Sequence, residues 1–348
     1  YGIMGYRVER RVLEAEVGKI IDLGIEMKMG VRIGTDVSLQ QLETDYDAVF
    51  IGVGAQTGRS LPIKGFTNRP ETTNAIEFLR AYEIHGDAFK LRKKVIVIGD
   101  GNVAMDVARL ACRLGSEATI ISAVPREEMN CYPDEFDDAI EEGAKIEYLT
   151  GTLEVLENED GVRGVKCARM VKKENGEEGW DSKIPFLRYK TTDEIFEIEA
   201  GMVVASIGQA TDMKGFEDSI HEQTSLLKLD KNLRIVGKEN VFGGGDALKV
   251  DLITTAVGHG RKAADSIDAF LNGLEMPEEP YKSVIKVKEQ DINYFFHSKQ
   301  IKRKHNVAKN IVGNHDEVLE ALTKEQAEEE SKRCMSCGLC FDCNQCAA

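Results

Sequence analysis

The chain has 348 residues, of which 42% are apolar and 30% charged, so it can bury a large core and is expected to form two domains. It carries 45 Lys and Arg against 60 Asp and Glu, a formal net charge of −15, which argues against nucleic acid as a partner. Apolar stretches such as Ala48 to Ala55 are far shorter than the ~18 to 20 residues that span a bilayer, and no basic-then-apolar leader opens the chain. We therefore expect a soluble, cytoplasmic protein without membrane insertion.

Apolar periodicity alternates between the helical and the extended type along the chain, which predicts an α/β fold. In chain order, we expect an amphipathic helix over 8–23, strands over 25–33, 47–54 and 95–98, a helix over 105–114, a strand over 118–122, an antiparallel insertion over 151–199, a strand over 202–206 and a helix over 253–271. Residues 276–310 are more polar and weakly periodic, which indicates a connector, and a further helix is expected over 317–333.

The stretch VIVIGDGNVA holds a G-x-G-x-x-A pattern between an apolar strand and a helix, and a second strand follows. This unit has about the ~30 residues of a dinucleotide-binding βαβ motif. In such a motif Gly99 makes the tight turn, Gly101 leaves room for the pyrophosphate and Ala104 lets the helix approach the strand. The amides of Asn102 and Val103 at the helix start then face the phosphates. The alternative is a glycine-rich turn without a ligand.

The end of the second strand should show which nicotinamide cofactor is bound. An acid there would bind the ribose diol, and an arginine would bind a 2′-phosphate. Residues 122–126 read SAVPR, so an acid is missing and the only arginine is Arg126, which comes late. Arg126 either reaches a phosphate or is a solvated loop charge, and the sequence leaves both open.

A second glycine motif, NVFGGGDA, precedes the helix expected from Ile253. Gly245 and Asp246 end its apolar strand, so the carboxylate can reach a ribitol hydroxyl while the helix start offers backbone donors to an electron-rich ring edge. An ordinary turn in which the Asp caps a helix is the other interpretation.

These motifs, together with YGIMGYR at 1–7, YDAVFIGVG at 46–54 and SIGQ at 206–209, resemble the flavin- and nicotinamide-dependent oxidoreductases typified by the small subunit of glutamate synthase. The resemblance covers most of the chain. It implies two Rossmann-like nucleotide-binding domains, with the nicotinamide domain inserted into the FAD domain, and hydride transfer between NAD(P)H and FAD.

The resemblance also assigns roles by position. It implies that Asp246 contacts the FAD ribityl chain, that Thr255 and Ala256 contact the flavin ring edge, and that Gly208 and Gln209 lie on the nicotinamide side. Ala123-Val124 stands where NADPH-using relatives have an Arg-Arg pair, which favours NAD(H).

The implied domain order is a partial FAD domain over 1–88, the NAD(P) domain over 89–237, the last FAD segment over 238–275, a connector and helix over 276–333, and a cysteine motif over 334–348. The family's first FAD fingerprint, an earlier G-x-G-x-x-G, is missing from this sequence. Either the chain is a fragment or a partner supplies that half of the flavin site, and the sequence does not decide between them.

Five of the eight cysteines fall within the last fifteen residues, at successive C-x-x-C spacing, and these are Cys334, Cys337, Cys340, Cys343 and Cys346. Such a run can wrap an iron–sulfur cubane, whereas structural zinc sites normally separate two C-x-x-C pairs by a longer loop. We therefore expect four of the five to ligate a [4Fe-4S] cluster, with zinc as the alternative. Relatives with this tail continue to a further cysteine, so we expect the motif to be truncated here.

The remaining reactive groups are given structural roles. Cys112, Cys131 and Cys167 are expected to be buried, inert thiols. The acid pairs at 137–138 and 141–142 are expected to form a solvated helix face.

The sequence thus predicts an enzyme that passes electrons from NAD(H) or NADP(H) through FAD to iron–sulfur clusters and a redox partner subunit of a larger complex. Ferredoxin is another candidate partner. The competing interpretation is a non-catalytic electron-conducting or docking subunit of such a complex.

Overall fold

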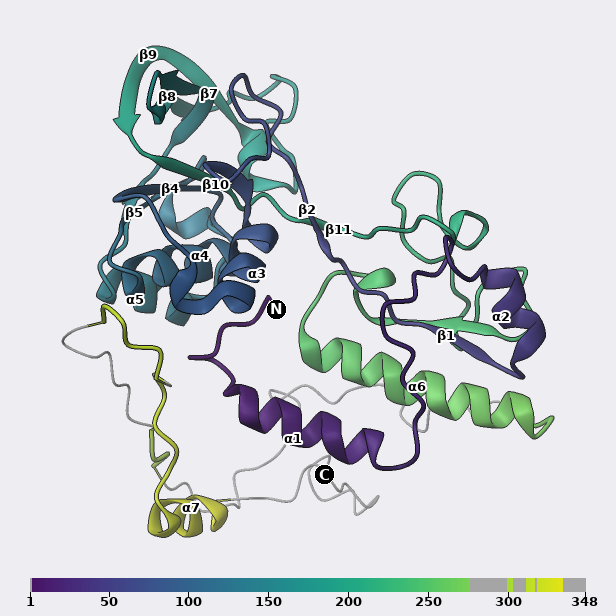
Figure 1. Ribbon diagram of the computed structural model, residues 1–348. Helices are drawn as coiled ribbons and strands as arrows, with labels where there is room; N and C mark the ends of the chain where they lie inside the picture. Colours follow the sequence, from purple (N-terminus) through teal and green to yellow (C-terminus); the bar gives the residue numbers. More distant parts are fainter. Residues whose placement is uncertain (1, 276–298, 303–310, 317, 334–348) are drawn as a thin grey trace.

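The computed structural model describes residues 2–275, 299–302, 311–316 and 318–333 (Figure 1). At its centre lies a five-stranded parallel sheet. In spatial order its strands are β3 (Thr72–Asn74), β10 (Met202–Ala205), β4 (Lys94–Ile98), β5 (Glu117–Ile121) and β6 (Lys145–Glu147). Strand β10 comes last in the chain but lies between β3 and β4, with Val203 paired to Thr72 on one side and Ile96 on the other.

Both faces of this sheet are covered, which is why β4 reads as a continuous apolar run. Val95 and Val97 point into a core shared with α3 (Ala75–His85), α4 (Asn102–Arg113) and α5 (Pro133–Glu141). Ile96 and Ile98 point into a second core on the opposite face. Because successive strand residues alternate between faces, four consecutive apolar residues serve two cores.

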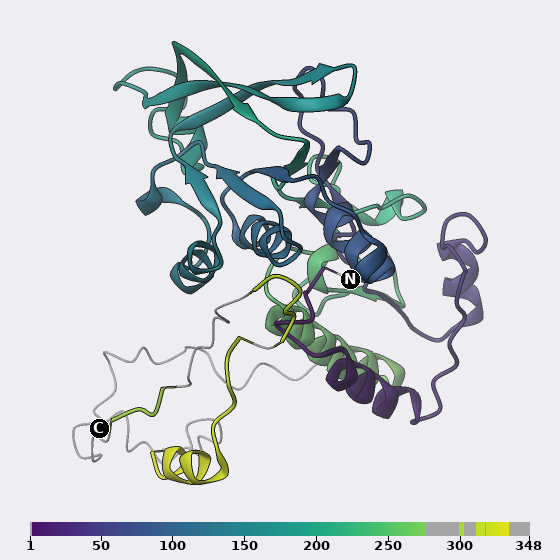
Figure 2. The ribbon, with the colours of Figure 1, turned by 60° about the vertical axis from the view of Figure 1, so that its left-hand side comes forward.

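The second core is closed by an antiparallel sheet of β7 (Thr150–Asn158), β8 (Gly161–Lys172) and β9 (Tyr189–Glu199). Figure 2 shows this sheet on one side of the parallel sheet and helices α4 and α5 on the other. Val165 and Cys167 of β8 are fully buried against Ile96 and Val203. The antiparallel insertion expected over 151–199 is confirmed.

A second part of the molecule is built on β1 (Val49–Ile51), which pairs in parallel with β12 (Val241–Gly243). Helix α6 (Ile253–Leu271) follows β12, and α2 (Leu39–Asp45) precedes β1. A short antiparallel pair, β2 (Thr57–Gly58) with β11 (Gln209–Ala210), runs between the two parts (Figure 1). Short 3₁₀ turns lie at Gly86–Ala88, Arg126–Glu128, Pro185–Arg188, Glu217–Ser219 and Gly245–Ala247.

Two further helices complete the described chain, α1 (Arg10–Ile21) and α7 (Lys324–Ser331). The expected helices over 8–23 and 253–271 are confirmed. Helix α1 buries none of its residues, and Leu13 and Ile20 of its apolar face are 45% and 54% exposed.

Two expectations over shorter segments are wrong. Residues 25–33 contain no strand, because turns surround Gly24 and Gly30 and only Ile33 makes an isolated bridge, to Val37. The last helix is shorter than 317–333, since a capping box at Thr323 starts it there. Most of the connector expected over 276–310 lies outside the described residues.

In the described part of the chain, none of the helices combines the length and the apolar character needed to cross a bilayer. The domain boundaries given above stay predictions.

Candidate functional site

The loop between β4 and α4 uses two glycines for opposite reasons. Gly99 has φ +126°, and a Cβ there would lie 2.2 Å from the carbonyl oxygen of Ser206, so no larger residue fits. Its amide donates to the carbonyl of Ile121 at 3.0 Å, which ties the loop to the end of β5. Gly101 has an ordinary φ of −87°, and a Cβ there would have no atom within 4 Å. The protein therefore leaves open space above Gly101, as a close-lying pyrophosphate requires.

Helix α4 begins at this open space. Gly101 is its N-cap, and the amide of Ala104 donates to the carbonyl of Gly101 at 2.9 Å. Ala104 is fully buried, as close packing of helix and strand demands. The side-chain oxygen of Asn102 accepts from the amide of Tyr132 at 2.8 Å, so this side chain holds the loop before α5. That leaves the first-turn amides of Asn102 and Val103 as the groups suited to an anion.

A pocket of about 170 Å³ lies beside this helix start. It is lined by the loop residues Gly101, Asn102 and Val103, by Ser206, Gly208 and Gln209 after β10, by Gly58, Ala75 and Ile76, and by Val250. Gly208 has φ +103°, a conformation that favours glycine. The structure thus brings together five residues predicted from two separate motifs.

Val250 shows which further segment of the chain lines the pocket. It lies between the GGGDA motif and α6, so the segment that follows the second glycine motif also lines the pocket. The pocket therefore lies beside both the loop before α4 and the segment that leads into α6.

The GGGDA turn is held by a residue that the sequence did not single out. Gly245 has φ +64°, and its amide donates to Nδ1 of His259 on α6 at 3.2 Å. Asp246 accepts from the amide of Asp251 at 3.2 Å, and a Cβ at Gly245 would lie 3.7 Å from that of Ala256. Gly245, Asp246 and Ala256 therefore share one turn against the start of α6.

The start of α6 offers the polar and apolar surface that a flavin needs. The amides of Thr255 and Ala256 both donate to the carbonyl of Leu252, at 3.0 and 3.2 Å, so the unused first-turn donors are those nearer residue 253. Ile253 and Val257 are 58% and 66% exposed next to this turn. A carboxylate, free amides and exposed aliphatic side chains fit a ribityl chain and an aromatic ring edge.

Arg126 is not part of the pocket. It lies on the 3₁₀ turn after β5, and its guanidinium is 3.9 Å from the ring centroid of Phe136 on α5. The five C-terminal cysteines lie outside the described residues. Within the described ranges, no cluster of three or more His, Cys, Asp or Glu suited to a metal is present.

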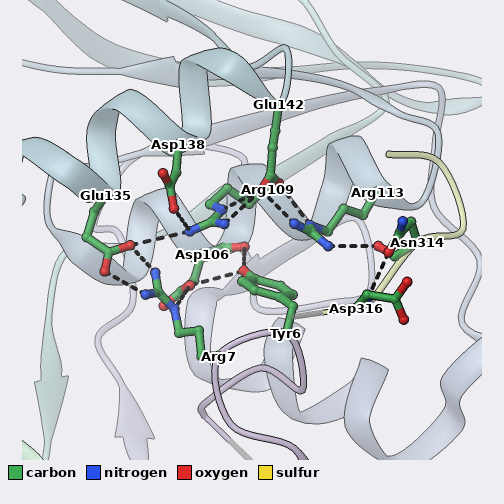
Figure 3. Close-up of polar contacts among 10 residues, drawn as sticks. All are labelled: Tyr6, Arg7, Asp106, Arg109, Arg113, Glu135, Asp138, Glu142, Asn314 and Asp316. Carbon is green, nitrogen blue, oxygen red and sulfur yellow. Dashed lines mark hydrogen bonds and ion pairs between the residues drawn. The ribbon is translucent and has the colours of Figure 1, made fainter. Parts of the chain in front are cut away.

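A buried ionic network lies at the opposite side of α4 (Figure 3). Both carboxylate oxygens of Glu142 accept from Arg109 and Arg113, at 2.6 to 3.0 Å, and all three side chains are at most 4% exposed. The ring of Tyr6 packs against both guanidinium groups, 4.8 and 4.3 Å from its centroid, and its hydroxyl donates to Asp106 at 3.1 Å. The YGIMGYR motif therefore has a structural role, because its Tyr6 packs against α4 and holds this helix in place.

The network corrects the expectation of a solvated acidic helix face for Asp138 and Glu142, whereas Asp137 and Glu141 are exposed as expected. Asp138 contacts Arg109 at 2.9 Å, and burial of Glu142 is outweighed by hydrogen bonds from Arg113 and Arg109, which hold its pKa below the usual value. Matching four-residue spacings, Arg109 with Arg113 and Asp138 with Glu142, were the available signal.

The three scattered cysteines are buried, as expected. Burial raises the pKa of all three thiols, and that of Cys167 reaches about 12. Since the thiolate is the reactive form, these side chains are suited to packing.

Residues 11–260 match the family model described as pyridine nucleotide-disulphide oxidoreductase. The chain belongs to this family. The match includes both glycine motifs and the pocket between them, so the expected resemblance to flavin- and nicotinamide-type oxidoreductases is confirmed.

Relatives in this family are named as subunits. The chain is 31% identical to the NADP(+)-dependent formate dehydrogenase subunit beta of Moorella thermoacetica, over 78% of this chain and 38% of that one. It is 29% identical to the NADPH-Fe(3+) oxidoreductase subunit beta of Geobacter sulfurreducens, over 97% and 55%, and to the glutamate synthase [NADPH] small chain of Halomonas elongata, over 78% and 60%. The chain thus spans about half the length of these relatives.

Solved structures share the fold of this chain. FprA from Mycobacterium tuberculosis in complex with NADPH matches with a TM-score of 0.61 and 18% identity, over 78% of this chain and 74% of that one. The His57Gln mutant of FprA matches with a TM-score of 0.62. The expected α/β fold with two Rossmann-like parts is confirmed.

Proposed function

We propose that this chain is the electron-input subunit of a redox complex, an NAD(P)H-dependent flavin oxidoreductase that passes electrons through FAD to iron–sulfur clusters and a partner subunit. The observation that carries the proposal is the pocket where Gly101 and the first turn of α4 meet Gly208, Gln209 and Val250. It joins the proposed nicotinamide loop to the segment that runs from the proposed flavin turn into α6.

The roles of the residues follow from their positions. Gly101 and the amides of Asn102 and Val103 would hold the pyrophosphate, and Gly208 and Gln209 would orient the nicotinamide. Asp246 would bind the ribityl hydroxyls, and the start of α6 near Thr255 would face the ring edge. A flavin bound there supplies the exchange between a two-electron hydride and single electrons.

The C-terminal run from Cys334 to Cys346 would carry electrons onward. Successive C-x-x-C steps suit a [4Fe-4S] cluster, and the relatives named as beta subunits or small chains support a partner that accepts the electrons. Ferredoxin is another candidate acceptor. Free thiols in such a run fit a reducing compartment, which supports the cytoplasm as its location.

The first test is nucleotide binding by the purified chain. Gly101→Val places a side chain in the open space above α4, so calorimetric titration should show NADH and NADPH binding weakened at least about 100-fold, with an unchanged unfolding midpoint. The control is Gly18→Val, which adds the same side chain in open space on α1. Unchanged affinity in Gly101→Val would show that the loop is not the site.

The second test concerns electron flow. The protein isolated anaerobically with its partner subunits should contain flavin whose absorbance is bleached by NAD(P)H. A complex with no flavin and no such bleaching would contradict the enzyme and favour the electron-conducting or docking subunit.

A further inference from the structure

The residue between the two loop glycines, Asp100, occupies a position that the proposed function leaves unused. The hydroxyl oxygen of Ser122, the first residue after β5, lies 3.2 Å from one carboxylate oxygen of Asp100, and its single hydrogen is donated either to that oxygen or to the carbonyl of Val124 at 2.9 Å. The side-chain amide of Asn130 donates to the other oxygen at 3.3 Å. Asp100 is half-buried, and both contacts fix its carboxylate beside the end of β5.

The end of the second strand is the place where a βαβ motif binds the adenosine ribose. In that motif an acid at the end of the second strand accepts from the ribose hydroxyls, and here that strand position is Ser122. The Ser122 hydroxyl is already engaged within the protein, because its hydrogen goes to Asp100 or to the carbonyl of Val124, and its oxygen accepts from the amide of Val124 at 3.2 Å. The carboxylate that the strand lacks is supplied from the loop.

Asp100 has acceptor capacity left after these bonds. Each carboxylate oxygen can accept two hydrogen bonds, and at most one position on each is taken. The two remaining positions can accept from a vicinal diol. The same negative charge opposes a 2′-phosphate, since like charges a few ångströms apart repel strongly at a partly buried site.

The cations around this rim are engaged elsewhere. Arg126 is the only basic residue between 122 and 132, and it stacks on Phe136. Arg188 donates to Glu128 on the same turn at 2.7 Å, and Lys172 lies 3.6 Å from that carboxylate. The described rim therefore presents Asp100 with no arginine pair to balance a phosphate.

We infer that Asp100 selects the cofactor of this site, accepting the ribose diol of NAD(H) and rejecting the 2′-phosphate of NADP(H). This inference rests on the proposed function, and it departs from the relatives whose names include NADP or NADPH. The acid that distinguishes the two cofactors lies in the glycine loop and not at the end of the second strand.

The test measures dissociation constants of NADH and NADPH for the purified chain. The parent should bind NADH at least about tenfold more tightly than NADPH. In Asp100→Asn, NADH binding should weaken about tenfold and NADPH binding should hold or tighten, so the preference disappears. Ala123→Arg adds a cation at the strand end and should strengthen NADPH binding alone. Asp160→Asn, on the exposed turn between β7 and β8, is the matched control and should change neither constant.

The outcomes separate the inference from the function on which it rests. A parent chain that prefers NADPH, or an unchanged preference in Asp100→Asn with a native unfolding midpoint, overturns the role of Asp100. Selective loss of NADPH binding in Arg126→Ala would move the discrimination to Arg126 and overturn it as well. A parent that binds neither nucleotide overturns the proposed function itself.

Discussion

At the scale of single residues, the two glycines of the loop between β4 and α4 have different roles, one in folding and the other in the proposed binding of a nucleotide. Gly99 is required by the protein, because its φ is +126° and a Cβ would meet the backbone of Ser206. Gly101 meets nothing within 4 Å, so any restriction there comes from a ligand. Two glycines that look equivalent in the G-x-G pattern thus have different functions.

Gly99→Ala should destabilise the fold. The added methyl group clashes with a backbone carbonyl between β10 and the loop, and the positive φ strains any L-residue, so we expect a loss of about 2 kcal/mol or more in the free energy of unfolding. Urea denaturation measures this. Gly101→Ala is the control and should lose less than about 1 kcal/mol. Equal losses in the two variants would contradict the distinction.

The sequence predicted the glycines of this site but not their polar neighbours. Gly99 and Gly101 follow from a G-x-G pattern that is local in the chain, and Gly208 follows from the resemblance to the family. Asp100 and His259 gain their roles from partners 22 and 14 residues away, and those contacts exist only once the fold brings the segments together.

At the scale of elements, α4 is held at both ends by different chemistry. Its first turn faces the pocket, and its later turns carry Arg109 and Arg113 into the buried network with Glu142. The N-terminal Tyr6 and the carbonyl of Asn314, which accepts from Arg113 at 2.8 Å, bring two distant segments to the same helix. The helix whose first-turn amides are proposed to bind the phosphates is therefore held in place by contacts along its later turns.

Glu142→Gln should remove the charge that balances two buried arginines. We expect a loss of about 3 kcal/mol in the free energy of unfolding at pH 7, because uncompensated buried charge is costly. Glu142 has a pKa lowered in the fold, so its contribution is present above the unfolded value of about 4.3 and is lost as the pH falls through the lower, folded value. The difference between parent and variant should therefore shrink below about pH 4.

Denaturation at several pH values tests this, with Glu141→Gln as the control on the exposed neighbour. That variant should lose at most about 1 kcal/mol at any pH. A Glu142→Gln protein as stable as the control at pH 7 would show that the network does not stabilise the fold.

Regular elements were predictable where local pattern and tertiary packing agree. The run Val95 to Ile98 and the helix from Ile253 follow from periodicity. Residues 25–33 are apolar enough for a strand, yet a strand needs a neighbour, and none of the described strands lies beside them. The acid pair at 141–142 was predicted to be exposed, because the sequence shows the charge of Glu142 but not the arginines that contact it in the fold.

At the scale of the whole molecule, the pocket proposed to bind nicotinamide and the cysteine run are separate in the chain. The pocket is built between Gly58 and Val250, and the first thiol of the run is Cys334. Loss of a cluster should therefore leave nucleotide binding intact.

Cys340→Ser tests this separation. Cys340 belongs to every choice of four consecutive ligands from the five, so its loss should abolish the cluster, whereas Cys346→Ser should spare part of it. Iron analysis and electron paramagnetic resonance of anaerobically prepared protein measure the cluster, and calorimetry with NADH should give an unchanged dissociation constant. A normal cluster signal in Cys340→Ser, or stoichiometric zinc in the parent, would overturn the iron–sulfur assignment.

The position of β10 has a consequence for how the chain is made. Its partner β4 emerges from the ribosome about 100 residues earlier, and the whole antiparallel sheet is synthesised in between. Until residues 202–205 arrive, β4 presents an unpaired apolar edge, which is a template for association with other chains. Pairs so distant in sequence also give a high contact order and slow folding. The strand that leads into the pocket wall therefore leaves the nascent chain with an exposed apolar edge until residue 205 has been synthesised.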